Sequence, residues 1–419
     1  MTSARAEISG PPDLKSASEP PKTGPDSQED ESGMERMGED IKLFGEQVAK
    51  RVDRVIKKKA FELWGDPWTF QGIPLIFPSP STGFNLGIKV QLQDIRRQDP
   101  HKAEVEAQIL ASDKGRYKHS FRVDFPHALD GRYRLTGRVA YDRDINFKYY
   151  GIGNDNNFQR SLIVDDDILF QNVRAGPSLT FQALRYLGNN VRAGPILGLK
   201  WTEVTAPTGS LLQMQQPSGL LGGRTHYVGL AIAYDTLDFE PYPSKGAIHE
   251  LYLYLHHKMT FSNYDFVRST YTYRRYFLLH RRLIFAHRMF FEALGGDVPF
   301  YELGATGGSS PTIGFGGDRF LRGYDSNRFI DRFKLVFGIE LRWDPLFFQF
   351  AKQDLTLSFV PFFDLGRVWP SMLPIQLDRW HASMGWGMRL IWNSRFVIRT
   401  DFAITPEGTN LILNLGNSF

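Results

Sequence analysis

The stretch Phe333-Lys334-Leu335-Val336-Phe337-Gly338-Ile339-Glu340-Leu341-Arg342-Trp343 alternates between two kinds of side chain. Every odd-numbered position is apolar, whereas the even-numbered positions include Lys334, Glu340 and Arg342. Successive side chains of a β-strand point to opposite faces, so the alternation predicts a strand with one apolar and one charged face. The run 355–365 repeats the pattern, which predicts a second strand of the same kind.

Strand-like runs of this type fill most of the chain after Gly83 and are separated by turn residues. We predict about sixteen antiparallel strands, with no helix between them. Their ranges are 84–95, 103–112, 117–125, 133–142, 146–151, 170–186, 191–202, 225–235, 247–259, 266–279, 283–294, 333–343, 355–365, 381–392, 396–403 and 410–419. Strands of about 9–11 residues with one apolar and one polar face are typical of a transmembrane β-barrel. A soluble sandwich would bury its apolar face, whereas we expect Trp343, Trp386 and Trp392 at a membrane interface.

The composition excludes several other classes of protein. The 419 residues include no cysteine, so neither a disulfide nor a thiolate metal site can form. No apolar run approaches the ~20 residues of a membrane helix. The net charge of +4 is spread along the chain and predicts no nucleic-acid-binding patch. Because the chain has no Gly-x-Ser-x-Gly, His-Glu-x-x-His or P-loop motif, we expect no enzyme, no cofactor and no metal site.

The lengths of the connections predict two different ends of the barrel. Connections from an even-numbered to an odd-numbered strand are short, namely 113–115, 187–190, 280–282 and 393–395. Connections from an odd-numbered to an even-numbered strand include the long polar loops 204–223, 295–332 and 368–378. Short periplasmic turns and long outer loops are the rule in outer-membrane barrels. The connection 344–354 is a longer exception.

The first 66 residues differ from the rest of the chain. Residues 1–33 are rich in Pro, Ser, Glu and Asp, which predicts a disordered tail. In the segment 34–66, apolar residues recur at spacings of three or four and predict an amphipathic periplasmic helix. This helix could pack on its own protein, bind a periplasmic partner through Met34–Trp64 or lie on a membrane surface, and the sequence leaves these alternatives open.

The polar, glycine-rich segment 307–332 contains the stretch Leu321-Arg322-Gly323-Tyr324. An arginine and a glycine between large apolar residues are a poor turn for a solvated loop, so we expect this loop to fold back into the protein. Glu340 and Asp364, on the next two strands, are the candidate carboxylates for the guanidinium. Gly338, Phe362 and Gly366 flank these carboxylates and are the candidate supporting residues. The alternative is that Arg322 is an exposed loop arginine.

Several short motifs occur in an order and spacing that together point to one family. Leu321-Arg322-Gly323-Tyr324 is similar to a Val-Arg-Gly-Phe loop motif, and Asp235-Thr236-Leu237-Asp238 with Pro243-Ser244-Lys245-Gly246 is similar to a strand–turn–strand motif. The final residues Leu415-Gly416-Asn417-Ser418-Phe419 resemble the aromatic-terminated β-signal of outer-membrane barrels, with Leu415, Gly416 and Phe419 as its candidate positions. Over roughly residues 70–419, the chain resembles the barrel domain of the bacterial surface antigen proteins, the BamA/TamA superfamily.

The resemblance implies a 16-stranded barrel in the bacterial outer membrane, with a sixth outer loop folded into the barrel and Arg322 held by Glu340 and Asp364. An organellar outer membrane is the alternative location. Family members that insert or secrete proteins carry periplasmic POTRA domains, whereas only some 70 residues precede the first predicted strand, so the resemblance is to a member without them.

The resemblance also implies a function in the insertion or translocation of outer-membrane proteins. The expected mechanism is sideways opening of the seam between 84–95 and 410–419, where a client strand would be added. Outer-membrane lipid, including lipopolysaccharide, and client proteins are the expected partners, and no nucleic acid is expected. The alternatives are a structural scaffold that recruits partners, or a passive pore.

Overall fold

The computed structural model of the chain describes ten segments. These are 61–63, 66–79, 83–94, 101–156, 167–240, 242–309, 315–350, 353–373, 377–392 and 396–419. The chain divides into two compact units, Met1–Val55 and Ile56–Phe419, and all of the described residues belong to the second. The predicted tail 1–33 and most of the predicted helix 34–66 therefore lie outside the described residues. Within the described segments, no helix is long and apolar enough to cross a membrane.

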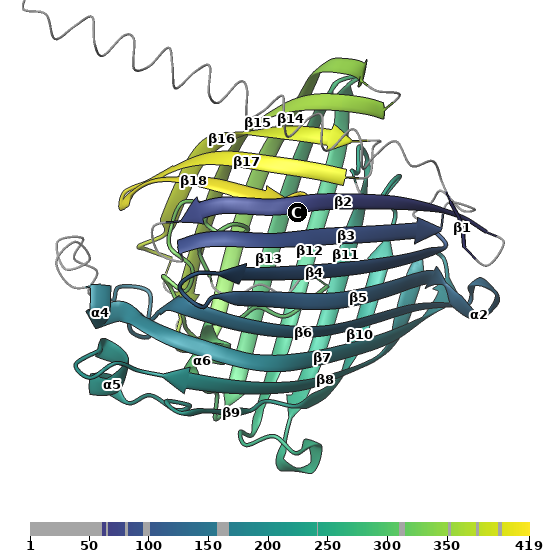
Figure 1. The fold of residues 1–419 in the computed structure, drawn as a ribbon. Helices are drawn as coiled ribbons and strands as arrows, with labels where there is room; N and C mark the ends of the chain where they lie inside the picture. Colours follow the sequence, from purple (N-terminus) through teal and green to yellow (C-terminus); the bar gives the residue numbers. More distant parts are fainter. Residues whose placement is uncertain are drawn as a thin grey trace, which may run out of the picture. The chain divides into compact units, whose positions relative to one another are not determined.

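The second unit is one antiparallel sheet in which each long strand pairs with the next along the chain (Figure 1). The long strands are β2 (Asp66–Ser79), β3 (Gly83–Asp94), β4 (Ala103–Ser112), β5 (Tyr117–His127), β6 (Tyr133–Lys148), β7 (Gln171–Gly188), β8 (Val191–Thr205), β10 (Tyr227–Asp235), β11 (Gly246–His256), β12 (Phe266–His280), β13 (Leu283–Gly296), β14 (Phe333–Phe350), β15 (Gln353–Trp369), β16 (His381–Trp392), β17 (Phe396–Thr405) and β18 (Gly408–Leu415). The predicted all-β antiparallel fold is confirmed.

Short elements lie beside these strands or in their connections. Two three-residue strands, β1 (Phe61–Leu63) and β9 (Gly222–Arg224), pair with β2 and β8. The helical elements are α2 (Ala128–Gly131), α4 (Asp167–Phe170), α5 (Leu211–Gln215), α6 (Phe300–Gly304) and the 3₁₀ turn η1 (Lys258–Thr260). Because β1 and the start of β2 occupy positions that we assigned to the helix 34–66, that helix was predicted to extend too far.

The number of long strands agrees with the prediction only because two errors compensate. The predicted strand 146–151 does not exist separately, since β6 continues to Lys148. The strand β2 was missed, because Pro67, Pro74 and Pro78 argue against a strand interior. The first strand of the sheet is therefore β2, and the barrel sequence begins before Gly83.

Because the sheet begins one strand earlier than we predicted, the turn 113–116 lies at the other end of the sheet. With β2 as the first strand, the turn 113–116 lies at the same end of the sheet as α4 and α5, and opposite α2 (Figure 1). Our assignment of 113–115 to the periplasmic end was therefore wrong. The connection 344–354 was also misread, because β14 and β15 extend into a hairpin in which Phe350 pairs with Gln353.

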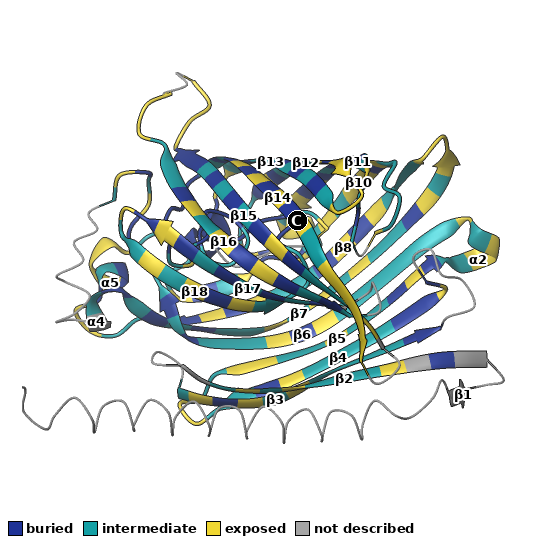
Figure 2. Cartoon of the chain, turned by 90° about the horizontal axis from the view of Figure 1, so that it is seen from above, coloured by how far each residue is buried: buried dark blue, intermediate teal, exposed yellow. Residues whose placement is uncertain are grey.

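The two faces of the sheet differ in chemistry, as the burial colours in Figure 2 show along many strands. On β14, Phe337, Ile339, Leu341 and Trp343 are exposed, and Trp343 retains 50% of its accessible surface. The intervening charged residues of β14 are buried. A soluble protein hides apolar side chains and exposes charged ones, so this inverted arrangement fits a sheet with lipid outside and a polar lumen inside. Here the lumen means the space on the inner, charged face of the sheet.

The two ends of the sheet are β2 and β18, so the seam lies between these strands. The predicted seam between 84–95 and 410–419 was wrong, because β3 (Gly83–Asp94) is an internal strand that pairs with β2. No register pair joins β2 to β18 among the described residues. The closed barrel that we expected is therefore not seen at this position. The strand β2 has 14 residues and β18 has 8, so part of β2 would remain an edge even if the two strands met. Prolines are tolerated on edge strands, where a missing N–H breaks no pairing, which explains their presence in β2.

Candidate functional site

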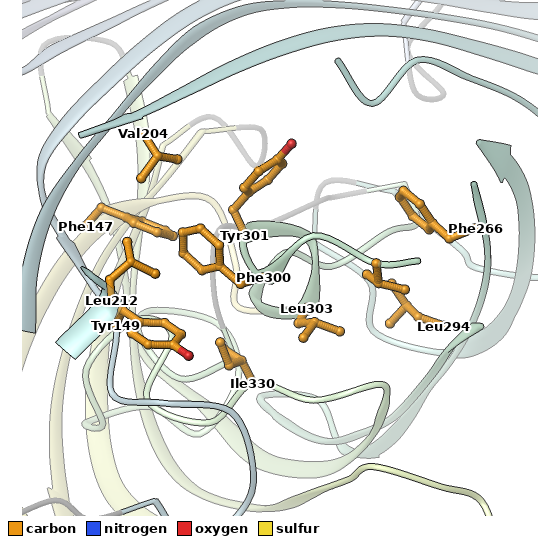
Figure 3. Close-up of a cluster of buried hydrophobic side chains, with 11 residues drawn as sticks. Phe147, Tyr149, Val204, Leu212, Phe266, Leu294, Phe300, Tyr301, Leu303 and Ile330 are labelled. Atoms are coloured by element: carbon orange, nitrogen blue, oxygen red, sulfur yellow. The ribbon is translucent and has the colours of Figure 1, made fainter. Parts of the chain in front are cut away.

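In the connection between β13 and β14, the described residues 297–309 and 315–332 fold into the lumen, and we call them the inner loop. Its helix α6 packs against strand residues in an apolar cluster (Figure 3). The ring of Phe300 lies 6.1 Å from that of Phe147 on β6 and 5.3 Å from that of Tyr149. Glu302 of α6 accepts hydrogen bonds from Arg268 of β12 at 2.8 Å and from Thr225 at 3.1 Å. The first half of the inner loop is therefore bound to the wall by apolar packing and by ion pairs.

Arg322 lies in the second half of the inner loop and is 0% exposed. Its Nε and Nη2 donate to the two carboxylate oxygens of Asp364 at 2.8 and 2.9 Å, and its Nη1 donates to Glu340 Oε1 at 2.7 Å. The backbone N–H of Arg322 also donates to Asp364 Oδ2 at 3.2 Å. Burial alone would lower the pKa of the Arg322 guanidinium, but Asp364 and Glu340 raise it above its ordinary value. The alternative of an exposed loop arginine is thus inconsistent with the structure.

The pairing of β14 with β15 brings the acceptors of Arg322 together. Gly338 lies opposite Asp364 and Glu340 lies opposite Phe362, so two adjacent cross-strand pairs supply both carboxylates. The Arg322 guanidinium carbon lies 3.6 Å from the centre of the Phe362 ring, which adds a cation–π contact. A Cβ atom on Gly338 would lie 2.9 Å from Asp364 Oδ1, so a side chain there would disturb the carboxylate.

The residues on either side of Arg322 define a tight turn. Leu321 and Gly323 have φ angles of +49° and +99°, in the left-handed region. A Cβ atom on Gly323 would lie 2.9 Å from side-chain carbons of Ala403 and Thr405 on β17, so the close approach requires glycine. Leu321 and Tyr324 belong to a second buried cluster, which joins the inner loop to the strands through Phe290, Val336 and Val368. Gly366 makes room for Leu321, because a Cβ atom there would lie 3.0 Å from Leu321 Cδ1.

The ion network contains more residues than we predicted from the sequence. Asp401 Oδ2 lies 3.5 Å from Arg322 Nη1, and Asp401 is also paired with Arg389. Arg342 donates from Nε to Glu340 Oε2 at 2.9 Å. Asp401, Arg389 and Arg342 alternate with apolar residues on their strands, which is a signal of an inward position, but alternation alone does not show which inward charges meet.

The C-terminal residues do not continue β18 as the predicted strand 410–419 requires. The strand ends at Leu415, Gly416 turns with a φ of +85°, and Ser418 and Phe419 are buried in the lumen. Phe419 packs with Tyr276 and Ile284, and Ser418 bonds to Glu340. The prediction that this aromatic residue lies on the last strand was therefore wrong. Its function as a β-signal stays a prediction.

The turn of the strand–turn–strand motif follows β10, at residues 236–240 and 242–245. It is folded and reaches towards the lumen. Asp238 Oδ1 accepts hydrogen bonds from the backbone N–H groups of Ser244 and Lys245, at 2.9 and 3.2 Å. Glu240 accepts two hydrogen bonds of 2.8 Å from Arg134 on β6, and Tyr242 donates to Asp344 on β14 at 3.0 Å. The turn therefore links strands that lie far apart in the order of the sheet.

The chemistry of the site is that of a clamp. Its guanidinium and carboxylate groups are engaged with each other, and a buried ion pair of this kind holds a loop without offering a nucleophile. Across the described segments, no group of three or more His, Asp or Glu side chains could hold a metal ion.

Comparison with known proteins identifies the family. The Omp85 superfamily domain matches residues 82–419, whereas no curated protein matches the chain. Among solved structures, BamA from Haemophilus ducreyi lacking POTRA domains 1–3 superposes with a TM-score of 0.50 at 12% identity, over 84% of this chain and 69% of that one. CdiB from Escherichia coli superposes with a TM-score of 0.51 at 11% identity, over 85% of this chain and 63% of that one.

At these identities the solved structures show a shared fold only, and the chain spans less than two thirds of the length of CdiB. The sequence match covers most of the chain, including every long strand except β2. The protein therefore belongs to the Omp85 superfamily, as a β-barrel of the bacterial outer membrane.

Proposed function

We propose that the protein inserts or translocates other proteins at the bacterial outer membrane by adding a client strand at its seam. The observation that carries this proposal is that, within the described segments, β2 and β18 have no register pairs with each other. Unpaired backbone N–H and C=O groups cost several kcal/mol each in lipid, so an open edge there is unfavourable unless another strand pairs with it. A client strand can supply the missing hydrogen bonds by β-augmentation.

The ion clamp of the inner loop supports this function from the inside. Arg322 connects the inner loop to Glu340 on β14 and Asp364 on β15, and lies near Asp401 on β17. The strand β17 pairs with β18, so the clamp lies on the wall next to the seam. A loop fixed at this position would keep the last strands rigid while β2 and β18 separate. Strand addition of this kind needs no catalytic group. The apolar outer face of the sheet would contact lipid.

Photo-crosslinking in native membranes tests the proposal. A photoreactive amino acid is placed at Ile76 on β2 or at Leu413 on β18, two exposed positions at the seam. Leu253 on β11, which is also exposed, is the control position on an internal strand. We expect adducts to newly made outer-membrane proteins from the seam positions and not from Leu253.

Other outcomes would contradict the proposal. Adducts to a single stable partner would favour a scaffold, which we also considered from the sequence. Equal adducts from Leu253 and from the seam would show that the contacts are not specific. An absence of protein adducts, together with a large single-channel conductance, would favour a passive pore.

A further inference from the structure

Two arginines face each other across neighbouring strands inside the lumen. Arg274 on β12 and Arg288 on β13 are register partners, and both line a cavity of about 620 Å³. Like charges directly opposite each other on an antiparallel pair are destabilising. Such a pair therefore requires compensating negative charge nearby.

The protein supplies only part of that compensation. Arg274 Nη2 donates to Glu250 Oε2 at 2.6 Å, and Glu250 also accepts a hydrogen bond from Ser309 at 3.0 Å. Arg288 donates instead to two backbone carbonyl groups, those of Ser418 at 3.2 Å and Arg319 at 2.7 Å. No carboxylate of the described segments lies within 4.0 Å of the Arg288 guanidinium nitrogens. Asp364 and Glu340 act on Arg288 only from a longer distance, and both are already paired with Arg322.

A third cation of the inner loop increases the imbalance. The side chain of Arg319 lines the same cavity and forms no ion pair or hydrogen bond with the described residues. Burial, together with the Arg274 cation, holds the pKa of Arg319 below its ordinary value, although Asp318 raises it. Asp318 is itself engaged, because its Oδ2 lies 3.8 Å from Arg399 and bonds to Asn414.

Unsatisfied hydrogen-bond donors also indicate that these arginines lack a negatively charged partner. The Nε–H groups of Arg274 and Arg288 are buried and have no acceptor among the described residues. Buried donors are normally satisfied, because an unsatisfied one costs about 1–3 kcal/mol. Arg288 is also held between the rings of Phe320 and Phe419, at 4.4 and 4.7 Å, so its position is fixed.

We propose that Arg274, Arg288 and Arg319 form a binding site for a phosphate-type oxyanion in the lumen. Guanidinium groups bind phosphate through directional, charge-assisted hydrogen bonds, and a tetrahedral oxyanion has enough oxygens for several of them. A bound phosphate would neutralise the opposed arginines and link the inner loop to β12 and β13. Free phosphate and the phosphate of a lipid headgroup share this chemistry. The proposal does not depend on opening of the seam.

The first test uses the purified full chain in detergent micelles. Its thermal unfolding is followed with increasing inorganic phosphate and, in parallel, with chloride at the same ionic strength. We expect phosphate to raise the unfolding temperature in a saturable way that chloride does not reproduce, because a ligand that binds only the folded state stabilises it. Dodecyl phosphate replaces inorganic phosphate in a second series. Binding of dodecyl phosphate alone would assign the site to a lipid headgroup, and binding of neither probe would overturn the proposal.

Variants locate the bound anion. Arg288→Gln and Arg319→Gln should each weaken the affinity for the active probe by about tenfold, the loss expected for one charge-assisted hydrogen bond. Arg281→Gln, at the exposed turn of the same β12–β13 hairpin, is the control and should bind as the unchanged protein does. Arg319 lies in a loop, so its variant remains informative if Arg288→Gln does not fold. Equal affinities in Arg319→Gln and Arg281→Gln would contradict the assignment.

Discussion

Arg322 carries its charge where it is shielded from solvent, and its neighbours make this possible. Its ion pairs run to β14 and β15, so one side chain fixes the inner loop to two strands of the wall. Transfer of a charge from water into a protein is costly, but a bidentate carboxylate and a second acid compensate for it. The same arrangement makes the site sensitive to the loss of any single partner.

Arg322→Ala tests the contribution of this charge. We expect the free energy of unfolding to fall by about 3–5 kcal/mol, because Asp364 and Glu340 would remain buried without their cation. Unfolding in urea and the heat-dependent shift of the band on gels would both report the change. Arg379→Ala is the matched control, because Arg379 pairs with Asp155 at 2.9 Å on the exposed surface. Equal behaviour of the two variants would contradict a stabilising clamp.

Gly366→Val tests the space under Leu321. A Cβ atom at Gly366 would lie 3.0 Å from Leu321 Cδ1 and 3.1 Å from Val336 Cγ2. We expect overpacking to destabilise the protein by about 1–3 kcal/mol, although valine suits a strand. Gly295→Val on β13 is the control, because a Cβ atom there meets only Val267 Cγ2, at 3.7 Å. The midpoints of urea unfolding compare the two variants, and a midpoint for Gly366→Val at or above the control would disprove the packing argument.

At the scale of elements, the inner loop obtains its structure from contacts with strands rather than from local sequence. Its apolar residues pack against residues of β6, β8 and β12, which are distant in sequence, as well as against Leu294 at the end of β13. Several of its charged residues, including Glu302, Arg322 and Arg328, are neutralised by acids and bases of the wall. Asp331, near the end of the loop, is an exception, because it is buried without a cation within 4.0 Å in the described segments and accepts a hydrogen bond from the Arg332 backbone at 2.8 Å.

The titration of Asp331 predicts a pH dependence of stability. Burial raises its pKa from 3.8 to about 6, so between these values the folded state binds a proton that the unfolded chain does not. Asp331 should therefore cause stability to fall as the pH rises from about 4 to about 6, by at most about 3 kcal/mol. Asp331→Asn removes this contribution, and the difference in unfolding free energy between the two proteins should grow in favour of the variant over that range.

A control separates this effect from the titration of other carboxylates. Asp378 lies in an exposed loop, and the hydrogen bond from Arg367 lowers its pKa. Asp378→Asn should therefore show no gain in relative stability with rising pH. Parallel stability curves for the unchanged protein and Asp331→Asn would show that Asp331 does not titrate as proposed.

At the scale of the whole molecule, the sheet has a charged inner face and an apolar outer face. The free-energy cost of leaving backbone N–H and C=O groups unpaired therefore falls on the strands at its seam. In the part of the chain that the structure describes, every internal long strand pairs with a long strand on each side, whereas β2 and β18 each pair with one long neighbour, β3 and β17. Introduced cysteines can test whether this seam opens, because the chain has no cysteine of its own. Ile76→Cys is combined in turn with Leu411→Cys and Leu413→Cys, all exposed positions.

Oxidation of a seam pair should join β2 to β18 and abolish the adducts between client proteins and the seam. The control pair is Ile88→Cys with Ile109→Cys, which are register partners on β3 and β4. Its disulfide joins two strands that are already paired, so the adducts should remain. Reduction of the seam disulfide should restore them. Persistent client adducts in a protein with a fully oxidised seam would exclude sideways opening.

The sequence by itself determined the alternating strands, the all-β fold and the residues Arg322, Glu340 and Asp364 that meet in the lumen. Alternation with a period of two is a local property, and each strand shows it without reference to its neighbours. The tertiary structure decided the first strand of the sheet, because the prolines of β2 are acceptable only on an edge. It also decided the inward turn of the C-terminus and the addition of Asp401 to the clamp. These features depend on which inward residues meet across the lumen, and no local pattern contains that information.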